Sequence, residues 1–360
     1  MTIKSPLLAR PGAVEAGGAD AGVASHYGEP LREQRALAGG AAVVDLSHRG
    51  VVTVTGPDRL SWLNTLSSQQ LTGLAPGQSS ELLLLSVQGR IEFDARVVDD
   101  GATTWLIVEA AEAGALAEWL NKMKFMLRVE IADASADWAV LGSTRRVAEW
   151  TSLLVWEDPW PHVGAGGYSY AVVGEDAHPG LERPWFEYLV PAAELEATVG
   201  ERPLAGVWAA EALRVAAWRP RWGAETDDKT IPHELDLLRT AVHLNKGCYK
   251  GQETVARVHN LGHPPRRLVF LQLDGSQHTI PAAGSEVRSG DRKVGTVTSV
   301  AQHYEMGPVA LAVVKRSVAP EDVLTVVDGE EPYTAAQEVI VAPDAGQVVG
   351  RQSGFLRGPR

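Results

Sequence analysis

The hydrophobic pattern of the N-terminal half alternates between strand-like and helix-like segments. A β-branched run over residues 51–55 predicts a strand, and Gly56-Pro57-Asp58 then forms a turn that begins a helix with leucines at near-helical spacing. Gln88-Gly89-Arg90 separates two further strand-like runs and is typical of a hairpin. The predicted strands are 51–55, 82–87, 91–98, 103–108, 127–131 and 138–141, and a second helix covers 112–124. This order indicates an α+β sheet covered by helices.

The C-terminal half changes character after Pro264-Pro265. Residues 144–184 predict a connecting region with a short strand over 168–173, and the next elements are a strand over 185–190 and a helix over 206–218. Beyond residue 265, β-branched or alternating runs separated by glycine-rich turns predict a small β-barrel, with strands over 267–273, 293–300 and 309–315. We therefore expect a loosely ordered segment over 1–30, an α+β region of two lobes over 31–260, a barrel over 261–345 and a polar tail over 346–360.

Length and composition place the chain among folded globular proteins. It has 360 residues, of which 45% are hydrophobic and 22% charged, enough for two or three domains. No apolar run reaches the ~18 residues of a membrane-spanning helix, and residues 1–10 lack a hydrophobic region of the signal-peptide type. The single cysteine, Cys248, forms no intramolecular disulfide, as is usual in a reducing compartment. We expect a cytoplasmic protein without a membrane partner.

The net charge is −12, which repels nucleic-acid phosphate, so we expect no nucleic-acid partner. Residues 239–267 reverse this sign, because they carry six basic residues and one acid, Glu253. The basic residues are Arg239, Lys246, Lys250, Arg257, Arg266 and Arg267. A basic segment in an acidic chain favours an anionic ligand, although a solvated basic loop has the same composition.

The densest cluster of reactive side chains is Lys246-Gly247-Cys248-Tyr249-Lys250-Gly251-Gln252-Glu253. Positive charge on both sides favours the thiolate form of Cys248, which makes it a candidate nucleophile or redox group. A free cysteine is equally often a small buried hydrophobe, and the sequence leaves both interpretations open. We predict no metal site, because there is no second cysteine and His243 and His259 form no compact ligand set.

Two further segments offer polar chemistry. Glu92 and Asp94 follow the hairpin turn and would share one face of a strand, where they serve a site or simply face water. Arg214, Trp218 and Arg219 combine a flat apolar ring with cations, which suits an aromatic anion, although Trp218 fits a core position equally well. The chain lacks GxxxxGK[ST] and GxGxxG, which excludes P-loop ATPases and Rossmann-type nicotinamide enzymes.

Several motifs over residues 41–315 resemble the aminomethyltransferase (glycine-cleavage T-protein) superfamily. They are Asp45-Leu46-Ser47-His48-Arg49-Gly50, Val54-Thr55-Gly56-Pro57-Asp58, Gln88-Gly89-Arg90-Ile91, Arg219-Pro220-Arg221-Trp222-Gly223-Ala224-Glu225 and Ile231-Pro232-His233-Glu234. Within this superfamily, residues 246–253 resemble the signature of the YgfZ branch, tetrahydrofolate-binding proteins that support iron–sulfur cluster assembly or repair.

The resemblance implies a three-lobed ring of two α+β lobes and a C-terminal β-barrel, with tetrahydrofolate or a polyglutamylated or one-carbon derivative in a central channel. By position, Asp94, or less well Glu92, is the acid near the folate, and Cys248 is the functional thiol. Ala216 stands where T-proteins carry a glutamate that binds the pterin, which argues against glycine cleavage itself.

Folates combine a flat ring system with an anionic tail, so a binding site needs an aromatic slot with cations at its mouth. The residues that we expect to bind the folate are Asp94, Arg214, Trp218, Arg219, Lys246, Lys250, Gln252 and Arg257, and the two catalytic candidates are Cys248 and Asp94.

Three functions remain open at this point. The first is a folate-binding accessory protein for iron–sulfur cluster assembly or repair, with Cys248 as the reactive group and iron–sulfur proteins as partners. The second is a folate-dependent aminomethyltransferase or demethylase, in which Asp94 stabilises a developing iminium. The third is a non-catalytic folate-binding module with Cys248 packed. The thiol signature and Ala216 favour the first.

Overall fold

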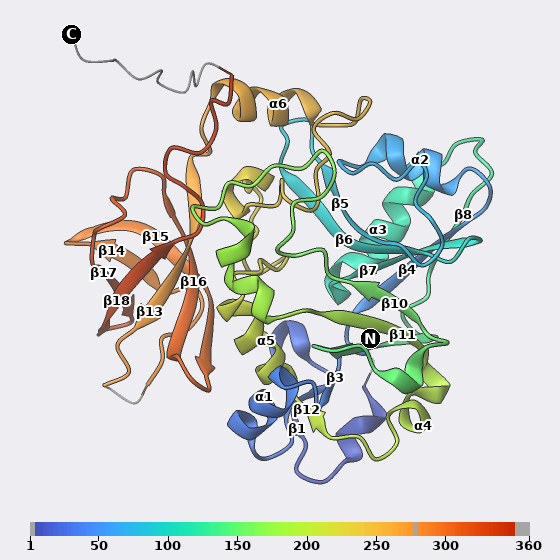
Figure 1. Ribbon diagram of the computed structural model, residues 1–360, viewed down its shortest axis with the longest axis horizontal. Helices are drawn as coiled ribbons and strands as arrows, with labels where there is room; N and C mark the ends of the chain where they lie inside the picture. The colour runs from blue at the N-terminus through green and yellow to red at the C-terminus, as the bar shows by residue number, and fades with distance from the viewer. Residues whose placement is uncertain (1–3, 277–278, 350–360) are drawn as a thin grey trace.

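Two five-stranded sheets and a six-stranded barrel organise the computed structural model, which describes residues 4–276 and 279–349 (Figure 1). The first sheet has the order β5-β6-β7-β4-β8. Its strands are β4 (Gly50–Thr55), β5 (Ser79–Leu85), β6 (Ile91–Asp99), β7 (Thr103–Val108) and β8 (Glu130–Asp133). Helices α2 (Arg59–Leu66) and α3 (Ala110–Met123) cover one face, where Leu63, Leu116 and Leu120 pack on the strands. The hairpin and both helices predicted from the hydrophobic pattern are confirmed.

The second sheet, of order β10-β11-β9-β3-β12, packs on the open face of the first. Its strands are β3 (Val43–Asp45), β9 (Trp138–Ser143), β10 (Leu154–Glu157), β11 (Phe186–Pro191) and β12 (Leu204–Ala205). Val44 and Trp156 from this sheet meet Val51 and Ile107 from the first in one buried core. Helices α1 (Pro30–Ala38), α4 (Leu195–Val199) and α5 (Val207–Ala216) surround this lobe. The α+β class is confirmed.

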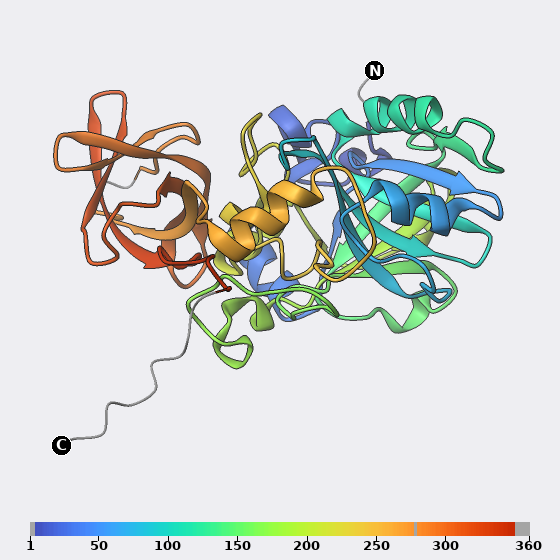
Figure 2. The ribbon, with the colours of Figure 1, turned by 90° about the horizontal axis from the view of Figure 1, so that it is seen from above.

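The barrel follows α6 (Gln252–Leu261) and closes in the order β13-β16-β15-β14-β17-β18. Its strands are β13 (Arg266–Leu273), β14 (Glu286–Ser289), β15 (Arg292–His303), β16 (Gly307–Lys315), β17 (Leu324–Asp328) and β18 (Glu331–Val339). Valines such as Val269, Val287 and Val326 fill its interior. Figure 2 shows the barrel on one side and both sheets on the other, with α6 between them. The predicted C-terminal barrel is confirmed.

The N-terminal segment differs from the loosely ordered start that we expected. Over residues 4–30 it forms a hairpin of β1 (Val14–Glu15) and β2 (Ala24–His26), and Leu7 and Val23 are fully buried. These apolar side chains fix the segment, because exposing them again would cost hydrophobic free energy. Short 3-10 helices in the chain are η1 (Pro6–Ala9), η2 (Gly18–Asp20), η3 (Ala148–Trp150), η4 (Glu175–Ala177), η5 (Pro179–Glu182), η6 (Ala192–Glu194) and η7 (Pro232–Leu235).

Three other expectations need correction or lie outside the structure. The strand predicted over 168–173 is only an isolated bridge between Ala171 and Val341. The strand predicted over 127–131 starts later, at Glu130, because a turn closed by the Leu127 N–H and the Lys124 carbonyl precedes it. Of the predicted polar tail, residues 350–360 lie outside the described residues. No helix in the described part of the chain is both long and apolar enough to cross a membrane.

Candidate functional site

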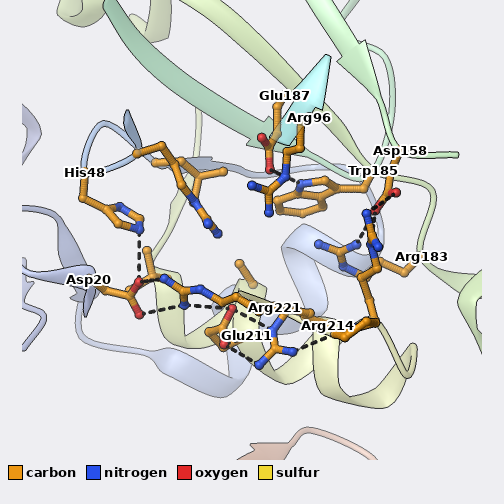
Figure 3. A pocket seen from close by; sticks show the side chains of 16 residues that line it. Asp20, His48, Arg96, Asp158, Arg183, Trp185, Glu187, Glu211, Arg214 and Arg221 are labelled. Atoms are coloured by element: carbon orange, nitrogen blue, oxygen red, sulfur yellow. Dashed lines mark hydrogen bonds and ion pairs between the residues drawn. The ribbon is translucent and has the colours of Figure 1, made fainter. Parts of the chain in front are cut away.

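A cluster of charged side chains is buried where the two sheets meet the end of α5 (Figure 3). It surrounds a cavity of about 20 Å³, which has room for about one water molecule. The charged members are Asp20, His48, Arg49, Arg96, Asp158, Arg183, Glu187, Glu211, Arg214, Arg219 and Arg221. This cavity is too small for a folate ring, which needs a larger space.

Ion pairs hold the two arginines that we expected to meet a folate tail. Arg219 contacts Glu81 at 2.7 Å and Asp158 at 3.2 Å. Arg214 contacts Glu211 at 2.9 Å and Glu225 at 3.0 Å. Both guanidinium groups are buried, and these carboxylates neutralise them. Arg214 and Arg219 therefore tie structural elements together, and their charges are already compensated within the chain.

Asp94 borders a second small cavity, of about 10 Å³, together with Glu112, Arg96 and Arg219. One oxygen of Glu112 accepts a hydrogen bond from the Asp94 backbone N–H at 3.0 Å, and the other accepts from the Glu109 N–H at 3.2 Å. Burial raises the pKa of Asp94 to about 7. Burial and the neighbouring Asp94 raise the pKa of Glu112 to about 9. These two carboxyl groups can hold and exchange a proton near neutral pH.

Glu92 does not continue the alternation of β6 toward Asp94. Phe93 pairs with Leu84 and Ile91 pairs with Leu85, so Glu92 is an extra residue in a β-bulge. The Glu92 carboxylate instead contacts the Lys250 ammonium at 3.0 Å. Of the two acids proposed from the sequence, Asp94 alone borders the buried cavity.

An open cleft of about 930 Å³ lies beside this buried cluster. Its walls are η2, the start of β4, the first turn of α3 and the loop over residues 221–224. His48, Arg49 and Arg221 border both the cleft and the first small cavity, and Glu109 and Trp222 border both the cleft and the second. The cleft has the size of a cofactor pocket, and its floor is the charged cluster.

Several buried polar atoms at the floor have no hydrogen-bond partner among the described residues. They include Nε of Arg49, which is a donor, and Nη1 of Arg219, also a donor. Oε2 of Glu187 is an acceptor in the same position. Of these residues Arg49 borders the open cleft, whereas Arg219 and Glu187 line the small cavities. A pterin ring carries acceptor atoms along its edge, so Nε of Arg49 fits such a ring.

The cysteine-containing segment lies elsewhere, against the β5–β6 hairpin. Cys248 is exposed and lines neither the cleft nor the two small cavities. The Lys246 ammonium donates to the carbonyls of Ser67 at 2.7 Å and Gln69 at 2.8 Å. Lys246 therefore anchors the chain after α2, and its ammonium is not free for an anion.

The other members of this segment are also placed by local packing. The Gln252 side-chain amide donates to the Lys246 carbonyl at 3.3 Å, and Arg257 is exposed on α6. Gly251 adopts a φ of +88°, and a Cβ there would approach the Ser86 carbonyl to 2.6 Å, so the turn requires glycine. None of Lys246, Lys250, Gln252 and Arg257 lines the cleft.

Trp218, which the sequence allowed either as a ring that binds a ligand or as a core residue, lies in the core. It is 5% exposed and packs against the rings of His178 and Phe270. Trp222, four residues later, lines the cleft instead. Sequence reasoning missed Trp222 and the acids Glu109 and Glu112. For the two acids, one signal was available: Glu109 and Glu112 form a capping box at the start of the helix.

Within the described residues, no group of three or more His, Cys, Asp or Glu side chains is arranged to hold a metal ion. The cleft therefore offers its ligand arginines, carboxyl groups, an indole ring and the first turn of α3. This set suits a flat polar ring system that carries an anionic extension.

Comparisons with known proteins agree with the fold. Residues 23–143 match the GCVT N-terminal domain, and residues 266–351 match the glycine cleavage T-protein C-terminal barrel domain. An aminomethyltransferase of Nostoc sp. is 30% identical over 80% of this chain and 80% of its own length. One from Corynebacterium aurimucosum is 28% identical over 82% of this chain and 84% of its own.

A solved structure has the same fold. The glycine cleavage system aminomethyltransferase T from Bartonella henselae superimposes with a TM-score of 0.72 at 19% identity, covering 93% of this chain and 94% of that one. Neither the matched domains nor these relatives are named for the YgfZ branch or for iron–sulfur cluster assembly.

Proposed function

Because the chain belongs to the glycine cleavage T-protein (aminomethyltransferase) family, we propose that it binds a tetrahydrofolate in the 930 Å³ cleft and acts on the one-carbon unit that this folate carries. The observation that carries the proposal is the floor of the cleft. Trp222 and Glu109 border both the cleft and the second small cavity, which Asp94 and Glu112 also line. A flat aromatic wall and protonatable acids are the parts that such a ligand and such a reaction need.

In this proposal each part of the floor has one task. The Trp222 ring supports the pterin, and the unpartnered Nε of Arg49 donates to an acceptor on its edge. When bound, the folate supplies a nitrogen that accepts the one-carbon unit. The Asp94 carboxylate stabilises the positive charge that develops on the substrate nitrogen, and Glu112 holds the proton that must move. Because Ala216 carries no carboxyl group, Glu112 on α3 provides the second acid beside Asp94 in this proposal.

Iron–sulfur cluster support remains a second candidate, and one observation favours it. The Cys248 thiol is exposed, on a loop between two glycines, so a partner protein can reach it without entering the cleft. In that function the folate site and the thiol are separate, and each is lost by different substitutions.

Calorimetric titration of tetrahydrofolate tests the cleft. We expect W222A to weaken binding about fivefold or more, because an aromatic stacking contact is lost. W119A is the matched control, since Trp119 packs on Phe93 away from the cleft, and it should bind as the wild type does. Wild-type protein that does not bind tetrahydrofolate would overturn the proposal.

Activity separates the two candidates. With an S-aminomethyl thioether as donor, whose C–S bond breaks as the bond to the folate nitrogen forms and whose carbon keeps its oxidation level, D94N should keep its folate affinity within about twofold and lose one-carbon transfer by about 100-fold. C248A should leave both measurements unchanged. If C248A instead lowers cluster-dependent enzyme activity in cells while D94N does not, the second candidate is correct.

A further inference from the structure

The N-terminal segment brings one carboxylate, Asp20, to the buried charged cluster. This segment precedes the matched GCVT N-terminal domain, which begins at residue 23. The buried side chains of Leu7 and Val23 fix it on both sides, and η2, which ends at Asp20, lies between β1 and β2. Gly18 begins η2 at a φ of +63°, a conformation that suits glycine. The tip of this hairpin therefore has a fixed place on the protein.

Asp20 stands behind the wall of the proposed folate cleft. Gly18 and Ala21, on either side of it, line the cleft, whereas the Asp20 side chain lines the first small cavity. Its carboxylate contacts Nη2 of Arg221 at 2.6 Å and Nε2 of His48 at 3.0 Å (Figure 3). His48 and Arg221 both border the cleft. Asp20 therefore acts on a ligand in the cleft through these two side chains.

The Asp20 carboxylate determines which ring nitrogen of His48 carries the proton. Burial alone would raise the pKa of Asp20, but its hydrogen bond with His48 and the charge of Arg221 hold this pKa well below its usual value, so Asp20 is ionised. Burial lowers the pKa of His48, so its ring is neutral at pH 7. A neutral ring beside a carboxylate donates from the nitrogen nearest to it, here Nε2, which leaves Nδ1 as an acceptor. This Nδ1 is buried and has no hydrogen-bond partner among the described residues.

Arg221 is held between two walls of the cleft. Its Nη2 contacts Asp20 on η2 at 2.6 Å and Glu109, the residue before α3, at 2.7 Å. A third carboxylate, Glu211 on α5, lies 3.3 Å from Nη1. Without the charge of Asp20, Arg221 would keep its pairs with Glu109 and Glu211 but lose its tie to η2. Asp20 therefore joins the η2 wall to the α3 wall.

We infer that Asp20 is a positioning residue of the cleft, which presents Nδ1 of His48 as an acceptor to an N–H group of the bound ligand and holds Arg221 between η2 and α3. The inference rests on the proposed function, which places a tetrahydrofolate in this cleft. A reduced pterin carries N–H groups along its edge, so it can satisfy the buried acceptor. The selection of such a ligand thus depends on a residue from outside the two matched domains.

Calorimetric titration of the full-length protein with tetrahydrofolate compares D20N with E15Q. D20N keeps the size of the side chain and should bind about tenfold more weakly, because no carboxylate then holds His48 and the η2 side of Arg221. E15Q is the matched control and should bind as the wild type does, since Glu15 pairs with Lys4 at 2.9 Å in the same segment and does not line the cleft. In an H48A background the effect of D20N should shrink to about threefold or less, because the ring that Asp20 positions is gone.

Nitrogen NMR of protein labelled at the histidine rings gives a readout that a purely structural role would not move, and H48A identifies the His48 signal. Ligand-free wild type should carry the His48 proton on Nε2, and D20N should populate the other tautomer, because an asparagine amide can donate to Nε2. A wild-type ring protonated at Nδ1, tight binding by D20N, or an undiminished D20N effect in H48A would overturn the inference and leave the folate site standing. Wild-type protein that binds no tetrahydrofolate would instead overturn the proposed function.

Discussion

Replacing Arg219 by methionine tests whether this residue is a structural tie or a ligand contact. The guanidinium joins Glu81 on β5 of the first sheet to Asp158, which follows β10 of the second, at 2.7 and 3.2 Å. Methionine keeps most of the volume, so the main effect is electrostatic. Removing one partner of a buried ion pair typically costs about 3–5 kcal/mol, because the remaining charges stay buried without compensation. We expect R219M to lose stability in this range.

Urea unfolding at pH 7, followed by tryptophan fluorescence and circular dichroism, measures the loss, and the two probes show whether the lobes unfold together. R202M is the control: Arg202 pairs at 2.7 Å with Glu149, which is 67% exposed, and lies over the Trp150 ring, so a much smaller loss than in R219M is expected. E81Q/R219M should regain about 1–2 kcal/mol, because it removes one of the stranded charges. A loss below about 1 kcal/mol in R219M, together with weaker folate binding, would refute the structural role.

Two further predictions concern the acid pair and the core. Burial raises the pKa of Glu112 from 4.5 to about 9, so the folded protein binds a proton that the unfolded chain releases, and the contribution of Glu112 to the free energy of unfolding falls as the pH rises from 5 to 9. E112Q escapes this fall and should gain on the order of 2 kcal/mol relative to the wild type between pH 5 and pH 9 in urea unfolding, whereas a pH-independent difference would contradict the assignment. W218A should lower the free energy of unfolding by about 3–5 kcal/mol, because it leaves a cavity in the core. Trp218 is a non-glycine residue at φ 58°, a conformation that glycine adopts without strain. W218G should therefore cost no more than W218A in thermal unfolding, although glycine is ordinarily the worse replacement.

The sequence predicted most of the sheet and barrel strands, because their apolar periodicity is local. The run over residues 91–98 shows the limit of this method. It forms β6 as predicted, but the bulge at Glu92 arises from pairing with β5 and leaves no periodicity signal. Helix α6 was also missed: it is polar on average, and Val255 and His259 are its buried residues, so its apolar face is narrow.

The site was predicted in part for a different physical reason. Asp94 was chosen by the resemblance, which places an acid on the strand after the hairpin turn, whereas the local pattern alone fits acids that face water. In the structure Asp94 borders the second small cavity. The basic segment selected Lys246, and the Trp- and Arg-containing segment selected Arg219, as residues that meet an anionic tail, but neither pattern identifies partners that are distant in the chain. The acid that pairs with Arg219 is 138 residues away, and a carbonyl that binds Lys246 is 179 residues away. Only the fold brings these groups together.

The buried arginines of the cluster differ in the free-energy cost of holding their charge, and Arg49, which borders the cleft, differs from Arg214 in this respect. Arg214 lies among acids that raise its pKa, so its charge is compensated within the chain. Burial lowers the pKa of Arg49 well below its usual value, and the nearby Arg96 and Arg221 add to this effect. Buried charges are weak contributors to stability and often cost more than well-packed apolar residues. Arg49 nevertheless has a carboxylate partner, because its guanidinium contacts Glu109 at the border of the cleft. Its Nε has no partner among the described residues, and under the proposed function a ligand that accepts a hydrogen bond there would offset part of the cost of burying it.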